Sequence, residues 1–351
     1  MPLYCTIGIL FNLMMQPSGW DENMKLEEAF DRARLNSREK KYFDVANLPD
    51  GSTVRLPILV VHGHKPGKII LVLGAVHGDE HEGPQAIREV FGSLEPEQLI
   101  GKFVGVPAAN PPAHGVSTRE SPIDRLNLAR TFPGRSNGTV TERIAYQIAR
   151  MIMMSDFLID LHSSGTGLDS PTLCGYSAVK GEAGRMAREA ANIFGAPVVW
   201  EHPPVVPPGR TLSVAAEKGI PGLYTETSGG GWLTKDAVLC YKNGVLTVMR
   251  YLGMLPGPKA DASKVKHYIS GGGDLDKDSV IAPVSGFLLS LVDVLDQVGE
   301  GDIIGRIIDP LGETLQEVRA PSDGCIVFKK ANPIVYAGES IYLLAHQSAP
   351  E

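Results

Sequence analysis

The sequence predicts an α/β domain followed by a smaller β-rich domain. Three observations lead to this fold class. Short β-type segments alternate with helical segments over the first 255 residues or so, which is typical of helices packed on both faces of a sheet. After Asp278 only short β-type runs occur, separated by turns. This C-terminal part also contains an internal repeat, which predicts two similar halves.

The elements of the first domain follow from apolar runs and helical spacing. We expect strands where apolar and β-branched residues run together, at residues 53–63, 68–76, 102–110, 157–163 and 222–228. We expect helices at residues 83–94, 139–154 and 182–195. The second of these helices should begin with a capping box, because Glu142 follows Thr139 by three residues.

Composition and charge exclude several classes of protein. The chain has 351 residues and a net charge of −7, which argues against a nucleic-acid partner. No apolar run is long enough to cross a membrane. The four cysteines are far apart and form no C-x-x-C pair, so we expect free thiols and a cytoplasmic protein. The oligomeric state stays open, and a homo-oligomer is compatible with the sequence.

Composition also places the domain boundaries. Glycine and proline cluster between Leu255 and Asp278 without apolar periodicity, as at a boundary. The apolar start of the chain lacks a basic region and a cleavage site, so we interpret it as an untethered lead-in or an upstream start rather than a signal peptide. We therefore predict a lead-in (1–40), a main α/β domain (41–255), a linker (256–278) and a β-rich domain (279–351).

The repeat in the β-rich domain resembles a known small fold. It matches IAPVSGFLLSL from Ile281 with RAPSDGCIVFK from Arg319, and VGEGDIIGRI with VYAGESIYLL. The pattern resembles the biotinyl/lipoyl carrier fold, a barrel-sandwich hybrid. A carrier needs a lysine on the hairpin between its halves, and no lysine occurs from Ser279 to Phe328. We therefore expect a lipoyl-like domain without a carrier group, which shapes or covers a site in the main domain or builds an oligomer.

The segment Gly74–Gly83, GAVHGDEHEG, combines metal-binding side chains with glycines directly after an expected strand. His77 and Glu80 are three residues apart, so both can face one ion from a turn that enters a helix. Zinc accepts imidazole nitrogen and carboxylate oxygen, and catalytic zinc usually has three protein ligands. A solvated loop would explain the charges alone. The glycines and the position after a strand favour a metal site.

The third ligand should come from elsewhere in the fold. His162, in IDLHSSG, lies at the end of an expected buried strand. Asp160 lies on the same face of that strand and could accept the other N–H of a ligand histidine. The H-E-x-x-H motif of the zincins is not matched, because the glutamate between His77 and His81 is in the wrong place.

Four motifs together resemble the succinylglutamate desuccinylase/aspartoacylase family. They are, in order, GAVHGDEHEG, SPIDRLNLARTFPG, IDLHSSG and LYTETSGGG. The resemblance spans roughly Val54 to Leu252, and RESPIDRLNLARTFPGRSNGTVTE is most similar to the bacterial branch of N-acetyl-diaminobutyrate deacetylase-like deacylases. It implies a zinc-carboxypeptidase-like α/β/α sandwich with a mixed central sheet and a small β-rich tail. It also implies hydrolysis of N-acyl amino acids.

The resemblance assigns roles to residues. It implies one zinc ion (Zn2+) per chain, held by His77, Glu80 and His162, the same three residues as above. It implies that Glu226 is the general base that removes a proton from the activated water. Without the resemblance, Glu226 could equally be a structural carboxylate beside a glycine loop. It also implies that Arg119 polarises the scissile carbonyl and stabilises the oxyanion.

Three further residues are candidates for substrate binding. Arg130 matches the arginine of an Asn-Arg pair in the family, whose planar fork binds a substrate carboxylate in two places. Ala129 replaces the asparagine of this pair, which removes a hydrogen-bond donor. Asn127 could compensate only if the loop moves. Arg210 is either a substrate contact or a surface arginine.

These features predict a zinc amidohydrolase that acts on a small N-acylated amino acid or amine. Two alternatives stay open. One is a non-catalytic zinc-binding or ligand-binding module whose tail engages a partner. The other is a carboxypeptidase that acts on peptides, which a domain covering the cleft would disfavour.

Overall fold

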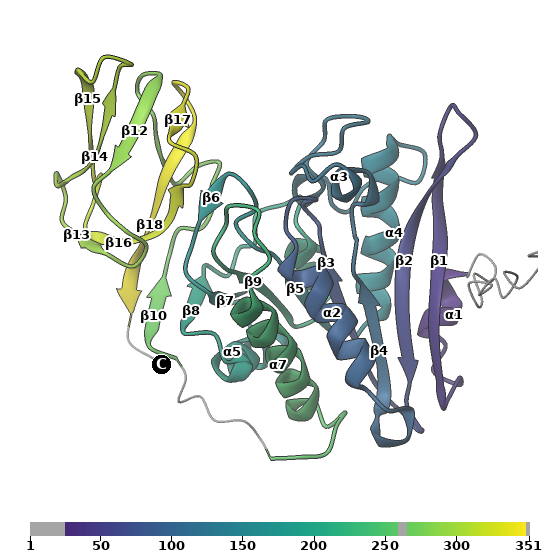
Figure 1. Cartoon of the computed structure of the whole chain (residues 1–351). Helices are drawn as coiled ribbons and strands as arrows, with labels where there is room; N and C mark the ends of the chain where they lie inside the picture. Colours follow the sequence, from purple (N-terminus) through teal and green to yellow (C-terminus); the bar gives the residue numbers. More distant parts are fainter. Residues whose placement is uncertain (1–24, 259–264, 349–351) are drawn as a thin grey trace, which may run out of the picture.

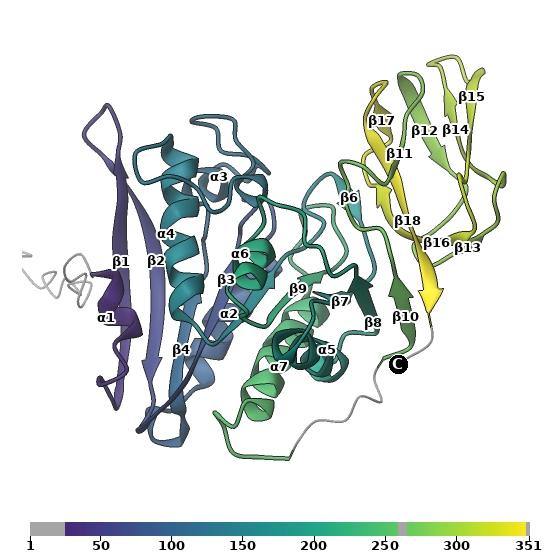
Figure 2. The same ribbon diagram turned by 180° about the vertical axis from the view of Figure 1, so that it is seen from behind.

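The computed structural model describes residues 25–258 and 265–348. It shows a large mixed sheet with helices on both faces and a smaller β-domain at one end (Figures 1 and 2). Most of the predicted lead-in, residues 1–24 with Cys5, lies outside the described residues. No described helix combines the length and apolar character needed to cross a bilayer.

The main sheet runs through the whole molecule. Its strands, in spatial order, are β1 (Ser37–Asn47), β2 (Thr53–His62), β4 (Ile100–Val106), β3 (Lys65–Gly74), β5 (Phe157–Leu161), β9 (Gly222–Glu226), β7 (Leu173–Ser177), β8 (Val198–His202), β10 (His267–Ser270), β18 (Ser340–Ser348), β16 (Gly324–Lys330) and β13 (Gln297–Val298). The pairs β3–β4, β3–β5, β5–β9 and β7–β8 are parallel, whereas β1–β2, β2–β4 and β7–β9 are antiparallel. The sheet is therefore mixed, as predicted.

Helices cover both faces of this sheet, so the predicted α/β/α sandwich is confirmed (Figures 1 and 2). One face packs against α2 (Glu82–Ser93), α5 (Glu182–Phe194) and α7 (Lys235–Tyr251). The other face packs against α1 (Leu26–Phe30), α4 (Val140–Met154) and α6 (Thr211–Glu217). The short helix α3 (Pro111–Gly115) and the 3-10 turns η1 (Pro96–Gln98) and η2 (Leu128–Arg130) lie in the connections.

Local sequence accounts for these elements. In α4 the isoleucines at positions 144, 148 and 152 recur with helical spacing, and all are buried. The predicted capping box at its start is present between Thr139 and Glu142. Strand β3 is apolar without alternation because it is buried on both faces: Leu71 packs into one core and Val72 into the other.

The strands and helices predicted from the sequence all occur, with small shifts at their ends. They correspond to β2, β3, β4, β5, β9, α2, α4 and α5. The sequence-based prediction missed β1, β7, β8 and the long helix α7. The three described cysteines are free thiols, as expected.

The C-terminal domain consists of two packed layers of strands and no helix among the described residues after Asp278. A four-stranded sheet contains β15 (Thr314–Arg319), β14 (Ile303–Ile308), β12 (Gly286–Ser290) and β17 (Ile334–Val335). The other layer is the end of the main sheet, where β11 (Ser279–Ile281) pairs with β18 and β6 (Leu168–Asp169) pairs with β16. Each pair of hydrogen-bonded strands within the domain has an equivalent pair after exchange of the two halves. The pair β12–β14 corresponds to β16–β18, the pair β12–β17 to β16–β13, and the pair β14–β15 to β18–β11. The repeat in the sequence therefore corresponds to a pseudo-twofold arrangement.

Two predicted boundaries need correction. Within the predicted linker 256–278, strand β10 pairs with β8 and with β18, so the main sheet continues into the C-terminal domain. Four residues without apolar alternation do not reveal a strand whose partners are distant in sequence. The predicted lead-in 1–40 likewise includes α1, whose Leu26 and Phe30 are buried, and the start of β1.

The hairpin that would carry a prosthetic group is the turn between β14 and β15. It is closed by Asp309 Oδ1, which accepts the N–H groups of Leu311 and Glu313 at 2.9 Å each. Since this turn offers no lysine amine, we expect no biotinyl or lipoyl adduct on the domain. Intact-mass measurement of protein purified from its native host checks this, and the mass of either adduct on the C-terminal domain would contradict it.

Candidate active site

Three neighbouring parallel strands, β3, β5 and β9, end at the same edge of the main sheet (Figure 1). The register sets Gly74 opposite Leu161, and Leu161 opposite Thr225. In an α/β sheet, the carboxyl ends of parallel strands are where sites form. The topology therefore brings together three segments far apart in sequence: the loop after β3, the residue after β5 and the last residue of β9.

The loop after β3 is a tight turn that depends on glycine. The N–H of Glu80 donates to the carbonyl of His77 at 3.4 Å. A Cβ atom on Gly78 would lie only 2.1 Å from the carbonyl carbon of Ala113, so a side chain cannot fit there. Because α2 begins at Glu82, His77 and Glu80 lie on the turn that enters this helix, as predicted.

His77, Glu80 and His162 form one buried group. His77 Nδ1 lies 2.6 Å from Glu80 Oε1, and His162 Nδ1 lies 2.8 Å from Glu80 Oε2. The three side chains each offer one ligand atom, and these atoms lie within 4.8 Å of one another. The structure thus brings together the three residues predicted as metal ligands.

Neighbouring residues hold His162 in place. Its Nε2 lies 3.1 Å from Asp160 Oδ2, and this carboxylate oxygen also accepts the hydroxyl of Thr211 at 2.5 Å. The hydroxyl of Tyr241 donates to the main-chain carbonyl of His162 at 2.6 Å. Such a carboxylate beside the second ring nitrogen fixes the tautomer of a ligand histidine, so the predicted role of Asp160 fits this geometry.

The group is electrostatically arranged to keep its carboxylate charged. Burial alone would raise the pKa of Glu80, but the imidazoles of His77 and His162 outweigh it and hold that pKa well below its usual range. Burial lowers the pKa of His77 to about 4, and the Arg119 guanidinium adds to this effect. Burial also opposes protonation of His162, but Asp160 and then Glu80 raise its pKa well above the usual value. An ionised carboxylate between two imidazoles is a ligand set suited to a cation.

The fit of this group to a metal can be judged from its donors. Two imidazole nitrogens and one carboxylate are a set that zinc accepts, with a further position left for water or substrate. The three residues are buried, and they are the one candidate metal group found in the described part of the chain. The residues present therefore fit a catalytic zinc ion.

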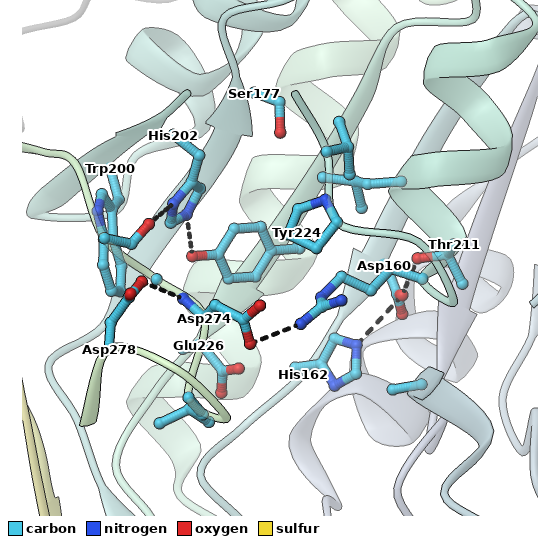
Figure 3. A pocket seen from close by; sticks show the side chains of 18 of the residues that line it. Asp160, His162, Ser177, Trp200, His202, Thr211, Tyr224, Glu226, Asp274 and Asp278 are labelled. Atoms are coloured by element: carbon cyan, nitrogen blue, oxygen red, sulfur yellow. Dashed lines mark hydrogen bonds and ion pairs between the residues drawn. The ribbon is translucent and has the colours of Figure 1, made fainter. Parts of the chain in front are cut away.

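A cavity of about 440 Å³ opens beside this group. Figure 3 shows its walls, with His162 and Asp160 at one end and Trp200, His202 and Asp278 at the other. Both parts of the molecule contribute: Phe328 of β16 belongs to the C-terminal domain. The β-domain therefore shapes the cavity, which is one of the roles expected for it.

Glu226 and Arg119 line this cavity near the histidines. Oxygen Oε2 of Glu226 is buried and has no hydrogen-bond partner among the described residues. Burial and then the nearby Glu80 carboxylate raise the pKa of Glu226 to about 8. Nη1 of Arg119 lies 3.3 Å from His77 Nδ1 and 3.6 Å from Glu80 Oε1. The structure thus supplies an uncommitted carboxyl group and a cation beside the metal-type group.

The two other predicted arginines also line the cavity, but each already pairs with an aspartate. Arg130 Nε lies 2.6 Å from Asp276 Oδ2, and Arg210 Nη2 lies 3.0 Å from Asp274 Oδ1. The side chain of Arg210 is only 20% exposed, so it is not a freely solvated surface arginine. Both aspartates belong to the loop after β10, within the stretch predicted as a linker.

Asn127 lies beside His77 of the metal-type group. Its Oδ1 is 3.2 Å from His77 Nε2 and accepts the N–H of Ala129 at 2.9 Å. This contact orients the His77 ring, a role that the sequence did not indicate. Ala129 itself lines the cavity beside Arg130.

A second group of cavity residues escaped sequence reasoning. Nδ1 of His202 donates to the carbonyl of Gly272 at 3.2 Å, and burial lowers the pKa of His202 to about 4, so its Nε2 is the acceptor. The hydroxyl of Tyr224 therefore donates to this Nε2 at 2.6 Å and presents its lone pairs to the cavity (Figure 3). Tyr224 could have been found, since it alternates with Glu226 on β9. His202 and the loop after β10 carried no such signal.

Comparison with known proteins adds to this geometry. The model of the succinylglutamate desuccinylase/aspartoacylase catalytic domain matches residues 66–252. N-alpha-acetyl-L-2,4-diaminobutyric acid deacetylase of Halomonas elongata is 31% identical over 298 residues, which cover 83% of this chain and 86% of that protein.

Solved structures agree with these matches. The product-bound ectoine utilization protein EutE (DoeB) of Ruegeria pomeroyi has a TM-score of 0.79 and 28% identity, covering 88% of this chain and 95% of that one. A succinylglutamate desuccinylase/aspartoacylase from Rhodobacter sphaeroides has a TM-score of 0.80 and 27% identity, covering 91% and 98%. The fold, the family model and the curated relative agree: the chain belongs to the succinylglutamate desuccinylase/aspartoacylase family.

Proposed function

We propose that this protein is a zinc-dependent deacylase that hydrolyses the amide bond of a small N-acylated amino acid or amine. The observation that carries the proposal is the buried group of His77, Glu80 and His162 in one cavity with Glu226, whose Oε2 has no partner in the described residues. Named relatives of this family are a deacetylase and desuccinylases, which supports amide hydrolysis.

The residues divide the reaction between them. His77, Glu80 and His162 would hold zinc, which supplies Lewis-acid polarisation and lowers the pKa of a water molecule. Glu226 takes the proton from the attacking water and then delivers it to the leaving amine, since its carboxyl group lies in the cavity beside the metal-type group with Oε2 unpartnered among the described residues. Arg119 donates hydrogen bonds to the oxygen that becomes negative during attack.

The cavity supports a small substrate rather than a peptide. Its volume of about 440 Å³ lies within the range typical of small-molecule sites. Phe328 and the loop after β10 contribute walls of this cavity. The carboxyl group of Glu226 also disfavours a non-catalytic binding module. A buried carboxyl oxygen without a hydrogen-bond partner among the described residues is explained by a role in proton transfer, whereas metal binding alone does not need it.

A direct substrate screen tests the proposal. Zinc-loaded protein should release amine from some N-acetyl or N-succinyl amino acids and diamines, with N-alpha-acetyl-L-2,4-diaminobutyrate as the first compound because of the named relative. The same assay with peptides that have free carboxyl termini tests the carboxypeptidase alternative. Cleavage of these peptides without cleavage of N-acyl amino acids would contradict the proposal.

A further expectation concerns Arg130. If its guanidinium holds a substrate carboxylate in the ground state, Arg130→Ala should raise KM for substrates with a free carboxylate and leave kcat nearly unchanged. For substrates in which a carboxamide replaces this carboxylate, KM should stay unchanged. Steady-state kinetics on matched pairs of substrates checks this. An equal loss on both members of a pair would mean that Arg130 does not bind the carboxylate.

The compartment is part of the same proposal. No disulfide joins the three described cysteines, Cys174, Cys240 and Cys325, which supports the expectation of a cytoplasmic protein. We keep a homo-oligomer as an open expectation, to be checked by light scattering.

A further inference from the structure

We propose that Asp276 is a specificity-determining residue that competes with a substrate carboxylate for Arg130. This inference rests on the proposed deacylase function, because it concerns the substrate cavity. It assigns a function to the loop after β10, residues 271–278, GGGDLDKD, which we call the aspartate loop.

Two of the five N–H donors of Arg130 are already engaged. Its Nε donates to Asp276 Oδ2 at 2.6 Å, and its Nη1 donates to the carbonyl of Ala129 at 3.1 Å. A guanidinium has five N–H groups, and one of the edges that suit a bidentate carboxylate contains Nε. Asp276 holds the Nε of this edge. A substrate carboxylate can use this edge of Arg130 only by displacing Asp276.

Of the two acceptors, Asp276 is the one that a ligand can displace. The carbonyl of Ala129 belongs to the residue next to Arg130 in the chain, so it stays in place. The side chain of Asp276 is 61% exposed and that of Arg130 is 28% exposed, and ion pairs this accessible to water are weak. Asp276 should therefore tune the affinity for a carboxylate rather than abolish binding.

The aspartate loop presents Asp276 independently of Arg130. Asp274 Oδ1 accepts the N–H of Asp276 at 3.2 Å, and the carbonyl of Asp274 accepts the N–H of Lys277 at 2.9 Å. Asp274 also pairs with Arg210, which fixes the loop to the cavity wall. The loop lies close against His202, since a Cβ atom on Gly273 would be 2.4 Å from its ring. Removing the charge of Asp276 should therefore leave the loop in place.

The two aspartates also change the charge of the cavity. Arg130 and Arg210 each pair with one of these aspartates, while Tyr224 and Glu226 also line the cavity. The cavity is therefore less favourable for an anionic substituent than its arginines alone would indicate. Asp276 sets how strongly the cavity discriminates against a substrate carboxylate. Its ion pair with Arg130 is more exposed than the pair of Asp274 with Arg210, so it is the more easily displaced.

The test compares N-alpha-acetyl-L-2,4-diaminobutyrate with its carboxamide. We expect Asp276→Asn to lower KM for the carboxylate about two- to fivefold, in keeping with a weak exposed pair, and to leave KM for the carboxamide unchanged. In the Arg130→Ala background the same substitution should have no effect on either compound. This double-mutant cycle isolates the Asp276–Arg130 interaction.

A matched control is Asp278→Asn, which removes one negative charge from the same loop. Asp278 Oδ2 accepts the N–H of Asp274 at 3.1 Å instead of meeting Arg130. If this control lowers KM for the carboxylate as much as Asp276→Asn does, overall charge decides and the inference is wrong. A higher KM for the carboxylate in Asp276→Asn would also overturn it, because Asp276 would then position Arg130 for the substrate.

A binding measurement separates this inference from the proposed function. Isothermal titration of both compounds into zinc-loaded Glu226→Gln protein, with and without Asp276→Asn, gives dissociation constants without turnover. The carboxylate should bind about two- to fivefold more tightly when Asp276 is replaced, and the affinity for the carboxamide should not change. If the wild-type protein hydrolyses no amide, the proposed function fails. The change in dissociation constant for the carboxylate still tests whether Asp276 competes for Arg130.

Discussion

Glu226→Gln should lower kcat by roughly a hundred- to ten-thousand-fold, the range that general-base assistance supplies. The amide is nearly isosteric with the carboxyl group, so the cavity should keep its shape. It cannot accept the proton of the attacking water, and the loss therefore appears in kcat because proton transfer is made in the transition state. KM should change little. Steady-state kinetics on the best substrate of the screen measures both constants.

The control for this variant must show that zinc and the fold are retained. Elemental analysis and thermal unfolding should match the wild-type protein. Glu120→Gln is a matched substitution, because Glu120 is an exposed glutamate next to Arg119 and should keep normal kcat. A Glu226→Gln enzyme with near-normal kcat would mean that another group takes the proton, and the proposed mechanism would be wrong.

His162→Ala should remove most of the bound zinc and with it the activity. We expect one zinc ion per chain in the wild-type protein, since the three ligand atoms lie within 4.8 Å of one another and are buried. Alanine leaves only His77 and Glu80, and two protein ligands are fewer than catalytic zinc sites usually have. Elemental analysis of the purified, folded variant measures the loss directly.

His202→Ala is the matched control for this experiment. His202 is also a histidine of the cavity wall, but it interacts with Tyr224 and Gly272 instead of the metal-type group. The control should therefore keep one zinc ion per chain. A folded His162→Ala variant with undiminished zinc would show that His162 is not a ligand, and the proposed metal site would fail.

The C-terminal domain is joined to the main domain beside the cavity. It continues the main sheet through β10 and β18, and aromatic contact between Trp200 and Phe328 joins the two parts, with their ring centroids 6.2 Å apart. Phe328 and the aspartate loop then contribute walls of the cavity.

Much of this protein could be predicted from its sequence. The alternation of apolar runs and helical periodicity indicated the sandwich, because burial of a strand or helix face imposes those periods locally. The group of His77, Glu80 and His162 could also be predicted, since these metal-type residues stand next to glycines or at a strand end within short segments. The pseudo-twofold β-domain was visible because similar halves leave similar sequences.

Other features were decided only by the tertiary structure. Strand β10 exists because β8 and β18 supply its partners, and no local period marks it. The contact of Asn127 with His77 joins positions fifty residues apart. The pairing of Asp276 with Arg130 joins positions 146 residues apart, across a boundary that composition alone would draw between them. From the sequence alone, an ion-paired aspartate on a glycine-rich loop cannot be told from a solvated one. Ion pairing depends on the distance between charges in space and not on their separation along the chain.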